Sequence, residues 1–259
     1  MTRPIRFAVV SSVLLLPATP LLAQSPACSG NSAVSIAAGV AQSDRVDLAA
    51  SPIQFGGRGL DVSASVDRSF GKTCISATAH GGRRMLAPEG ISASTERLID
   101  AGLQITALRP IYNNEAAGRS ISLGATLNGN LAFTQHMYAD AHLSNYRLGY
   151  VSLGPAVQMR QRIGPGTATL QLSTPLVAMV DHPYTSADAS EFSPQFRFTS
   201  VGGFRGVEGS AMYEIPINRR LSFIAGYRAG LMRYDDSQPV RALNQSLTFG
   251  FSTQLGPRR

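Results

Sequence analysis

The segment His142-Leu143-Ser144-Asn145 contains the residue types that a serine hydrolase uses. Side chains two positions apart in an extended chain lie on the same face, so the imidazole of His142 and the hydroxyl of Ser144 can approach each other. A histidine in this position takes the hydroxyl proton and makes the serine nucleophilic. The spacing predicts Ser144 as a candidate catalytic nucleophile and His142 as its base. The alternative is a solvated loop in which both residues are incidental.

Asp181 and His182 form a second candidate pair, with Asp140 and Asp188 on neighbouring predicted loops. A carboxylate beside an imidazole can activate water for hydrolysis. The competing interpretation is that this segment, rich in proline, tyrosine, threonine and serine, caps the end of a strand.

Metal, cofactor and nucleic-acid sites are not expected. His80 and His136 lie singly on predicted strands, without a second ligand at the spacing of a metal site. The formal charge is +7, but Lys72 is the only lysine and the arginines are spread along the chain. Nucleic-acid binding requires a clustered basic patch, so we expect no nucleic-acid partner.

The stretch from Ser120 to Thr134 shows which kind of element positions these residues. Its apolar and polar residues alternate: Ile121, Leu123, Ala125, Leu127, Leu131 and Phe133 share one parity, and Ser120, Ser122, Thr126, Asn128, Asn130 and Thr134 share the other. A period of two predicts a β-strand with one apolar and one polar face. The same alternation recurs at 34–40, 60–67, 73–81, 98–109, 147–163, 168–178, 207–217, 221–231 and 243–255. We therefore expect an all-β fold.

The polar faces and the connections indicate where the strands lie. The polar faces carry serine, threonine, asparagine, glutamine and glycine with few charges, which suits the interior of a narrow barrel, where Glu208 and Glu214 could pair with arginines. Short turns at 71–72, 164–166 and 218–219 alternate with longer connections at 42–57, 84–96, 138–146 and 181–195. This predicts an antiparallel up-and-down transmembrane β-barrel. If 196–217 is one strand, about ten strands result; a turn at 202–206 makes twelve possible.

The first 23 residues have the parts of a secretory signal. Arg3 and Arg6 precede a short apolar run, and small residues lead to a predicted cleavage after Ala23. The mature chain, residues 24–259, is then a single barrel domain. Cys28 and Cys74 are the only cysteines, and an exported compartment permits a disulfide between them. Two unpaired thiols are the alternative, because sequence alone does not show whether the two Cα atoms approach each other.

The composition agrees with an exported barrel. Hydrophobic residues make up 44% of the chain and charged residues 15%, against about 25% charged residues in soluble domains. After the N-terminal segment, no apolar run approaches the roughly 18 residues of a transmembrane helix. Membrane association must then come from strands.

These features together resemble bacterial outer-membrane β-barrel proteins. The end of the chain, Thr248-Phe249-Gly250-Phe251-Ser252-Thr253-Gln254-Leu255, is similar to the terminal signal of that class, but it departs at Thr253 and four residues follow it. The resemblance implies the outer membrane of a Gram-negative cell envelope, with membrane lipid and the barrel-assembly machinery as partners. A secreted soluble β-sandwich binding module is the alternative.

The His142 motif adds a second resemblance. It is similar to the His-x-Ser-Asn element of the outer-membrane phospholipase A and lipid A 3-O-deacylase barrels, which implies a lipid esterase using Ser144 and His142. No downstream asparagine or acid stands where those families orient the histidine. The Asp181 pair resembles that of the omptin proteases, except that its members are adjacent. Because small barrels fill their interiors, we expect a non-enzymatic barrel with a structural, loop-presenting or minor transport role before a porin-like channel or an esterase.

Overall fold

The computed structural model describes residues 32–47, 51–88, 94–139, 141–182, 184–186, 196–235 and 239–255. The predicted signal peptide, its cleavage point and Cys28 lie outside the described residues. Among those described, no helix is long and apolar enough to cross a membrane.

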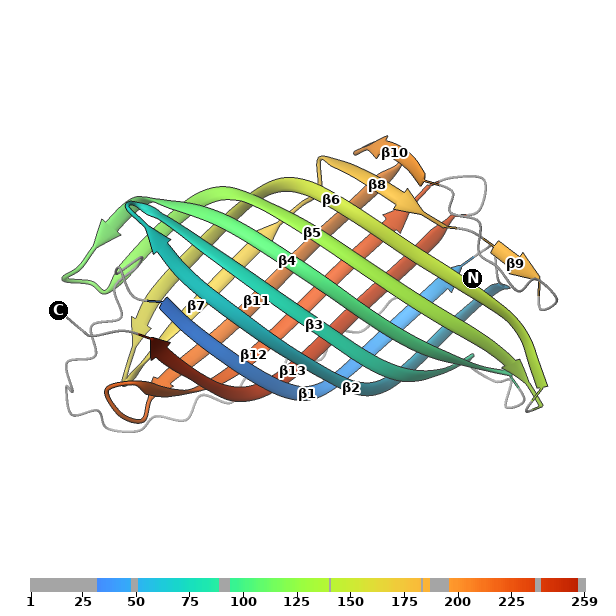
Figure 1. The fold of residues 1–259 in the computed structure, drawn as a ribbon, viewed down its shortest axis with the longest axis horizontal. Coiled ribbons are helices and arrows are strands. Elements are labelled where there is room, and N and C mark those ends of the chain that lie inside the picture. The colour runs from blue at the N-terminus through green and yellow to red at the C-terminus, as the bar shows by residue number, and fades with distance from the viewer. Residues whose placement is uncertain are drawn as a thin grey trace, which may run out of the picture.

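Ten antiparallel strands close into one barrel (Figure 1). In chain order they are β1 (Ser32–Asp47), β2 (Ser51–Phe70), β3 (Thr73–Pro88), β4 (Ser94–Asn114), β5 (Arg119–Tyr138), β6 (Ala141–Ile163), β7 (Gly166–Ser173), β11 (Phe204–Pro216), β12 (Leu221–Tyr234) and β13 (Val240–Leu255). Each pairs with its neighbours in this list, and β1 pairs with β13 to close the wall. Where these ten strands pair, the wall has no open sheet edge, as a membrane-spanning sheet requires.

The barrel has a short-turn end and a long-loop end. Turns at 71–72, 115–118, 164–165 and 217–220 lie at the short-turn end, where Ser32 also pairs with Leu255. The longer connections expected at 42–57, 84–96 and 138–146 are instead mostly strand, because β1 reaches Asp47 and β2 begins at Ser51. Strands of 16 to 23 residues such as β1 and β6 exceed the roughly 9 to 11 residues that cross a bilayer. Their ends therefore extend beyond the apolar band.

Along the barrel strands the main apolar face points outward, and no second protein layer covers it in the described part of the chain. Leu103, Leu123, Leu153 and Phe249 are 48%, 46%, 47% and 50% exposed. Side chains of the other parity, such as Asp61 and Thr126, are 2% exposed and face the lumen. A β-sandwich would cover one apolar face with another sheet. The alternative of a soluble sandwich is therefore wrong, and the predicted barrel is confirmed.

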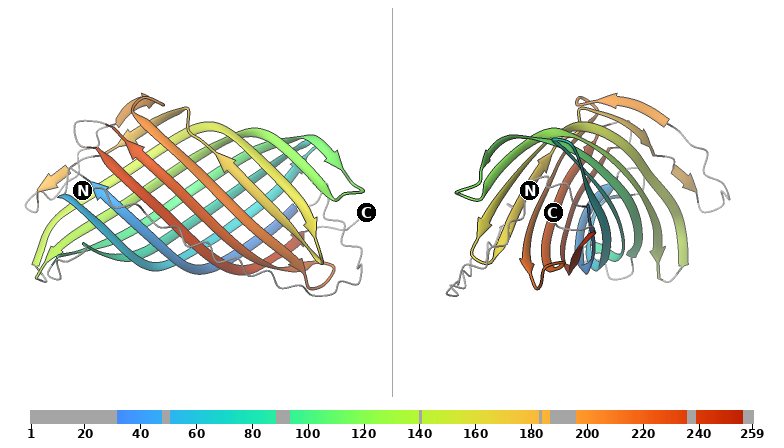
Figure 2. Two further views of the ribbon diagram at one scale, coloured as in Figure 1. Left: turned by 180° about the vertical axis from the view of Figure 1, so that it is seen from behind. Right: turned by 60° about the vertical axis from the view of Figure 1, so that its left-hand side comes forward.

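The long-loop end carries a small extension of the wall. β8 (Val177–Asp181) and β9 (Tyr184–Ser186) pair with the first half of β6, and β10 (Phe196–Ser200) pairs with β8. Figure 2 shows β8 and β10 leaning outward from the barrel. A turn at 201–203 separates β10 from β11, so 196–217 is not one strand. The barrel nevertheless keeps ten strands, since β10 joins the extension.

The strand β6 changes partner at Gly154. It pairs with β7 from Ala156 and with β8 up to Leu153. The backbone of Thr174 passes so close that a Cβ built on Gly154 would lie 1.8 Å from its carbonyl oxygen. A residue without a side chain is needed at this crossing.

Two apolar clusters fill part of the lumen towards the long-loop end. One joins Leu148, Ala178, Val180, Phe204, Tyr234 and Val240, and the other joins Phe55, Leu86, Leu98 and Ala132. The first cluster packs Phe204 of β11 near the residues of β8, where these two strands share no ladder of backbone hydrogen bonds. Side-chain packing therefore closes the wall at this point.

Candidate functional site

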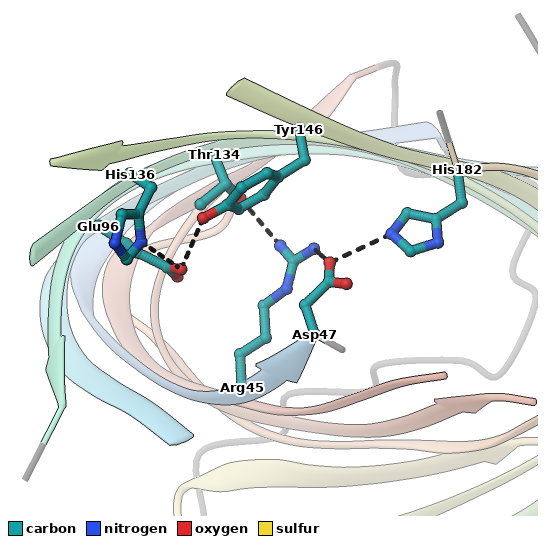
Figure 3. A network of polar contacts seen from close by, with 7 residues as sticks. All are labelled: Arg45, Asp47, Glu96, Thr134, His136, Tyr146 and His182. Atoms are coloured by element: carbon teal, nitrogen blue, oxygen red, sulfur yellow. Dashed lines mark hydrogen bonds and ion pairs between the residues drawn. The ribbon is translucent and has the colours of Figure 1, made fainter. Parts of the chain in front are cut away.

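Polar side chains from four strands meet inside the long-loop end of the barrel (Figure 3). Arg45 and Asp47 come from β1, Glu96 from β4, Thr134 and His136 from β5, and Tyr146 from β6, while His182 follows β8. All of them except His182 lie on strands, whose alternation directs these side chains into the lumen.

One part of this network links a serine, a histidine and a glutamate. The Nε2 atom of His136 lies 3.2 Å from Oγ of Ser94, and its Nδ1 atom lies 3.4 Å from Oε1 of Glu96. Ser94 and Glu96 are two residues apart on β4, and Glu96 is the register partner of His136 on β5. Tyr146 donates a second hydrogen bond to Glu96 at 3.0 Å. This connectivity is that of a serine–histidine–acid triad.

The other part is an ion pair between Arg45 and Asp47 of β1, whose further contacts reach β5 and the residue after β8. Arg45 donates to Asp47 at 2.6 Å and to the hydroxyl of Thr134 at 3.0 Å. The Nε2 atom of His182 lies 3.2 Å from the same Asp47 carboxylate. Arg45 and Asp47 are each 5% exposed. A buried charge pair of this kind persists because both partners are hydrogen-bonded.

A second charged layer lies deeper, at the middle of the barrel. Asp61 of β2 lies 3.8 Å from Arg84 of β3 and 3.1 Å from Arg228 of β12. Arg84 also donates to Asp100 of β4. Two arginines and two aspartates thus neutralise one another across the lumen.

Glu208 completes this middle layer. It accepts hydrogen bonds from Gln104 at 3.2 Å and Asn128 at 3.1 Å, and the attraction to an arginine that the sequence predicted is present as a charge interaction with Arg228. The close ion pairs of the middle layer use Asp61 and Asp100.

The layers divide the free space of the lumen. A cavity of 120 Å³ lies among the middle-layer residues, and a larger cavity of 320 Å³ opens towards the short-turn end. Serine, threonine and glutamine side chains line most of the larger cavity, with Asp67, Arg160 and Glu214 among them. We call this larger cavity the vestibule.

Solved structures share this architecture. The outer membrane protease OmpT from Escherichia coli superimposes with a TM-score of 0.59, over 87% of this chain and 97% of that chain, at 8% identity. The chain has the fold of an outer-membrane β-barrel. The translocator domain of autotransporter NalP from Neisseria meningitidis matches with a TM-score of 0.47 at 8% identity, covering 90% of this chain and 91% of that chain. No protein-family model and no curated protein sequence matches the chain.

The predicted pair His142 and Ser144 lies in the first residues of β6, at the long-loop end of this outer-membrane barrel fold. Their backbone pairs with β5: His142 is the register partner of Met137, and Ser144 that of His136. The side chains of His142 and Ser144 lie outside the described part of the structure, so their proposed roles stay a prediction.

Asp181 and His182 turn to different partners. Asp181 binds Arg147 at 2.5 Å, while His182 meets Asp47. The candidate pairing of Asp181 with His182 is not among these contacts, although His182 does have a carboxylate partner in Asp47. Asp140 and Asp188 lie outside the described residues. In the described part of the chain, no cluster of three histidine, cysteine or acidic side chains is placed to hold a metal ion.

Sequence reasoning missed the network around His136. His136 is the one histidine on β5, but Ser94 and Glu96 of the neighbouring strand meet both of its ring nitrogens. Glu96 is 40 residues away in the chain, and only the register of β4 against β5 brings the two together. No strand pattern pointed to it, because Ser94 and Glu96 lie in the segment 84–96, which was predicted as a connection.

Proposed function

We propose that the protein is an integral outer-membrane barrel that does not conduct solutes freely and that presents its long-loop end outside the cell. The outward apolar band supports the membrane location, since side chains such as Leu103 and Phe249 are about half exposed and no second sheet covers them in the described part of the chain. By the usual orientation of such barrels, the short turns face the periplasm. The predicted signal peptide would supply export.

The filled lumen is the observation that carries the proposed non-conducting role. Charged networks fill the lumen at two levels: Arg45 and Asp47 of β1 contact Thr134 and His182, and Asp61 meets Arg84 and Arg228. Apolar clusters occupy further space near the long-loop end. Side chains fill the interior of small barrels, and open aqueous channels belong to larger ones. A general porin role is therefore not proposed.

Two measurements test this proposal together. We expect the mature protein to fractionate with the outer membrane and to migrate differently on SDS gels before and after boiling, because a folded barrel withstands the detergent. In planar bilayers it should show no steady ion conductance. A water-soluble protein would contradict the location, and a stable open channel would contradict the closed lumen.

An ester hydrolase at Ser94 is the second candidate function, because Ser94, His136 and Glu96 have the connectivity of a catalytic triad. In this reaction the Ser94 hydroxyl attacks the ester carbonyl while His136 takes its proton and then passes it to the leaving alcohol. Water then releases the acid by the same route. Ser94 is only 6% exposed, so the closed site favours the non-enzymatic role.

A serine-reactive fluorophosphonate probe separates the hydrolase candidates. Labelling that Ser94→Ala abolishes would support the triad, and labelling that Ser144→Ala abolishes would support the predicted pair of Ser144 and His142. If neither serine is labelled and the protein hydrolyses neither phospholipid nor lipid A esters, both hydrolase candidates are excluded and the non-enzymatic role is supported. The protease activity named for OmpT is not proposed, because Asp181 and His182 bind different partners.

A further inference from the structure

Three arginines lie side by side at the long-loop end of the barrel wall. Arg205 of β11 is the register partner of Arg233 on β12, which in turn is the register partner of Arg241 on β13. All three residues are exposed. We propose that this row, which we call the arginine ladder, binds the phosphate groups of anionic lipids in the outer leaflet. The proposal rests on the membrane location and orientation proposed above.

The residues next to the ladder show that it points away from the lumen. Phe204 precedes the arginine of β11, Tyr234 follows that of β12 and Val240 precedes that of β13. These three neighbours are buried inside the barrel, at 3%, 3% and 0% exposure. Successive side chains of a strand point to opposite faces, so the arginines lie on the outer face of the wall.

The ladder lies at the edge of the outward apolar band. One outward row closer to the short-turn end, the same three strands carry apolar side chains that are also register partners: Val207, Leu231 and Leu243. On β13 the outward apolar side chains continue to Phe249 and Phe251. A ligand of the ladder therefore meets an apolar surface directly beside the three guanidinium groups.

The height of the band agrees with this position. Arg241 and Phe251 are ten positions apart on β13, about 34 Å along the strand. At the usual strand tilt this is about 25 Å along the membrane normal, which matches the apolar band of such barrels. Gln245, a polar residue of this outward row, accepts a hydrogen bond from Tyr227. With Phe251 at the inner boundary of the hydrocarbon, the ladder reaches the headgroups of the outer leaflet.

The protein neutralises part of the ladder's charge. Arg233 pairs with Asp235 at 2.6 Å. Arg205 donates hydrogen bonds to the carbonyl oxygens of Val201 at 3.0 Å and Gly202 at 3.3 Å. These carbonyl groups orient the guanidinium without cancelling its charge.

The charge of Arg241 is left for an external anion. Within the described part of the chain, Arg241 forms no ion pair. The outward carboxylate of β1, Asp44, is level with Leu243 instead, and Gln42 donates a hydrogen bond to it at 3.4 Å. Like charges directly opposite each other on neighbouring strands destabilise a sheet. An anion held between the arginines would offset this repulsion.

A lipid phosphate matches both parts of this surface. The planar guanidinium group binds two phosphate oxygens at once through its fork of N–H donors. Neighbouring strands lie about 4.8 Å apart, so adjacent arginines of the ladder can share one phosphate. The acyl chains of the same lipid then cover Val207, Leu231 and Leu243. A water-soluble anion would satisfy the charge but leave the apolar row without a partner.

Tryptophan quenching by brominated lipids tests this preference. Leu231→Trp places the single tryptophan of the chain one row below the ladder, and Leu127→Trp places it on β5, where its register partners Ile105 and Leu153 are apolar. The folded variants are placed in vesicles of phosphatidylcholine and phosphatidic acid, with each lipid brominated in turn. We expect phosphatidic acid to be enriched about fivefold beside position 231, the effect of one basic residue near an anionic surface, and not beside position 127.

The outcomes separate the ladder from the proposed membrane location. If neither brominated lipid quenches either tryptophan, the location fails and the ladder proposal fails with it. If both tryptophans are quenched but phosphatidic acid shows no greater preference for position 231 than for position 127, the location stands and the ladder proposal is overturned.

Substitution of the ladder itself is the matched comparison. In the Leu231→Trp background, Arg205→Gln, Arg233→Gln and Arg241→Gln together should abolish the preference while quenching by phosphatidylcholine remains. Lysine at the same three positions keeps the charge but loses the fork, so it should leave a weaker preference. Arg219→Gln with Arg220→Gln, in the exposed turn after β11, should leave the preference at position 231 unchanged.

The heat-dependent gel shift verifies that each variant has folded. A preference that persists in the folded glutamine variant would overturn the ladder as the lipid site. If the glutamine variant does not fold, the comparison of positions 231 and 127 in the unsubstituted ladder decides the proposal.

Discussion

Asp61 on β2 and Arg228 on β12 meet at 3.1 Å across the lumen, although β1 and β13 separate their strands in the wall. Asp61 also lies 3.8 Å from Arg84, so one carboxylate stands between two guanidinium groups. Its side chain is 2% exposed. The contact joins strands that share no backbone hydrogen bonds and makes the middle layer a brace of the barrel.

Removal of this carboxylate should destabilise the barrel strongly. Asp61→Ala leaves Arg84 and Arg228 facing each other, and loss of one partner of a buried ion pair costs about 3 to 5 kcal/mol. Urea titration of the protein folded into lipid vesicles, followed by the gel shift, measures the change. Glu115→Ala in the exposed turn after β4 is the control and should change stability by no more than about 0.5 kcal/mol. Equal effects of the two variants would show that Asp61 does not brace the lumen.

Because the outward side chains face lipid, the cost of placing an arginine there should depend on its depth in the bilayer. Leu127 lies outward near the middle of β5, and Leu255 lies outward at the end of β13. An arginine costs about 2 to 4 kcal/mol at the bilayer midplane and about 0 to 1 near the interface. Leu127→Arg should therefore lower the unfolding free energy in vesicles much more than Leu255→Arg. The reverse order would contradict the proposed position of the membrane.

Gly154 should tolerate no side chain. Any Cβ there meets the carbonyl oxygen of Thr174 at 1.8 Å, whereas at Gly129 the nearest atom is 3.9 Å away. We expect Gly154→Ala to fold poorly and Gly129→Ala to fold like the unmodified protein, as measured by the yield of the folded gel band. Normal folding of Gly154→Ala would mean that β6 does not change partner at this point.

Phe204 should hold the wall closed beside β8. Its side chain is 3% exposed within the apolar cluster, while Phe198 on β10 is 78% exposed. Phe204→Ala should cost about 3 to 5 kcal/mol through the cavity it leaves, and Phe198→Ala no more than about 0.5 kcal/mol. Urea titration in vesicles compares the two. A mild effect at Phe204 would show that the cluster does not seal this seam.

The strands of the barrel wall could be predicted because the two-residue alternation of apolar and polar side chains shows which face of each strand points outward. Alternation placed Leu123 and Leu153 outward and Thr126 inward, and the structure confirms each of these directions. The length of the strands was not predictable, since past the apolar band both faces become polar and the period fades. Backbone pairing continues there, so segments expected to be loops are strand up to Asp47 and from Ser51.

The pairing of charged and polar side chains inside the lumen could not be predicted from the sequence. Which arginine meets which acid is set by strand register and by distances across the barrel, as with Asp61 and Arg228. Glu208 interacts with the charge of Arg228 and also accepts hydrogen bonds from Gln104 and Asn128, two contacts that the sequence does not indicate. The triad connectivity at His136 likewise arises from two strands meeting in register.

A membrane barrel requires hydrocarbon to cover its outward face, and the absence of tryptophan from the sequence makes this contact measurable by fluorescence. Leu153→Trp places a single fluorophore on that face, and Thr169→Trp places one in the vestibule wall. In vesicles with brominated acyl chains, we predict strong quenching of the first variant and weak quenching of the second. An unquenched tryptophan at position 153 in folded protein would contradict the membrane barrel.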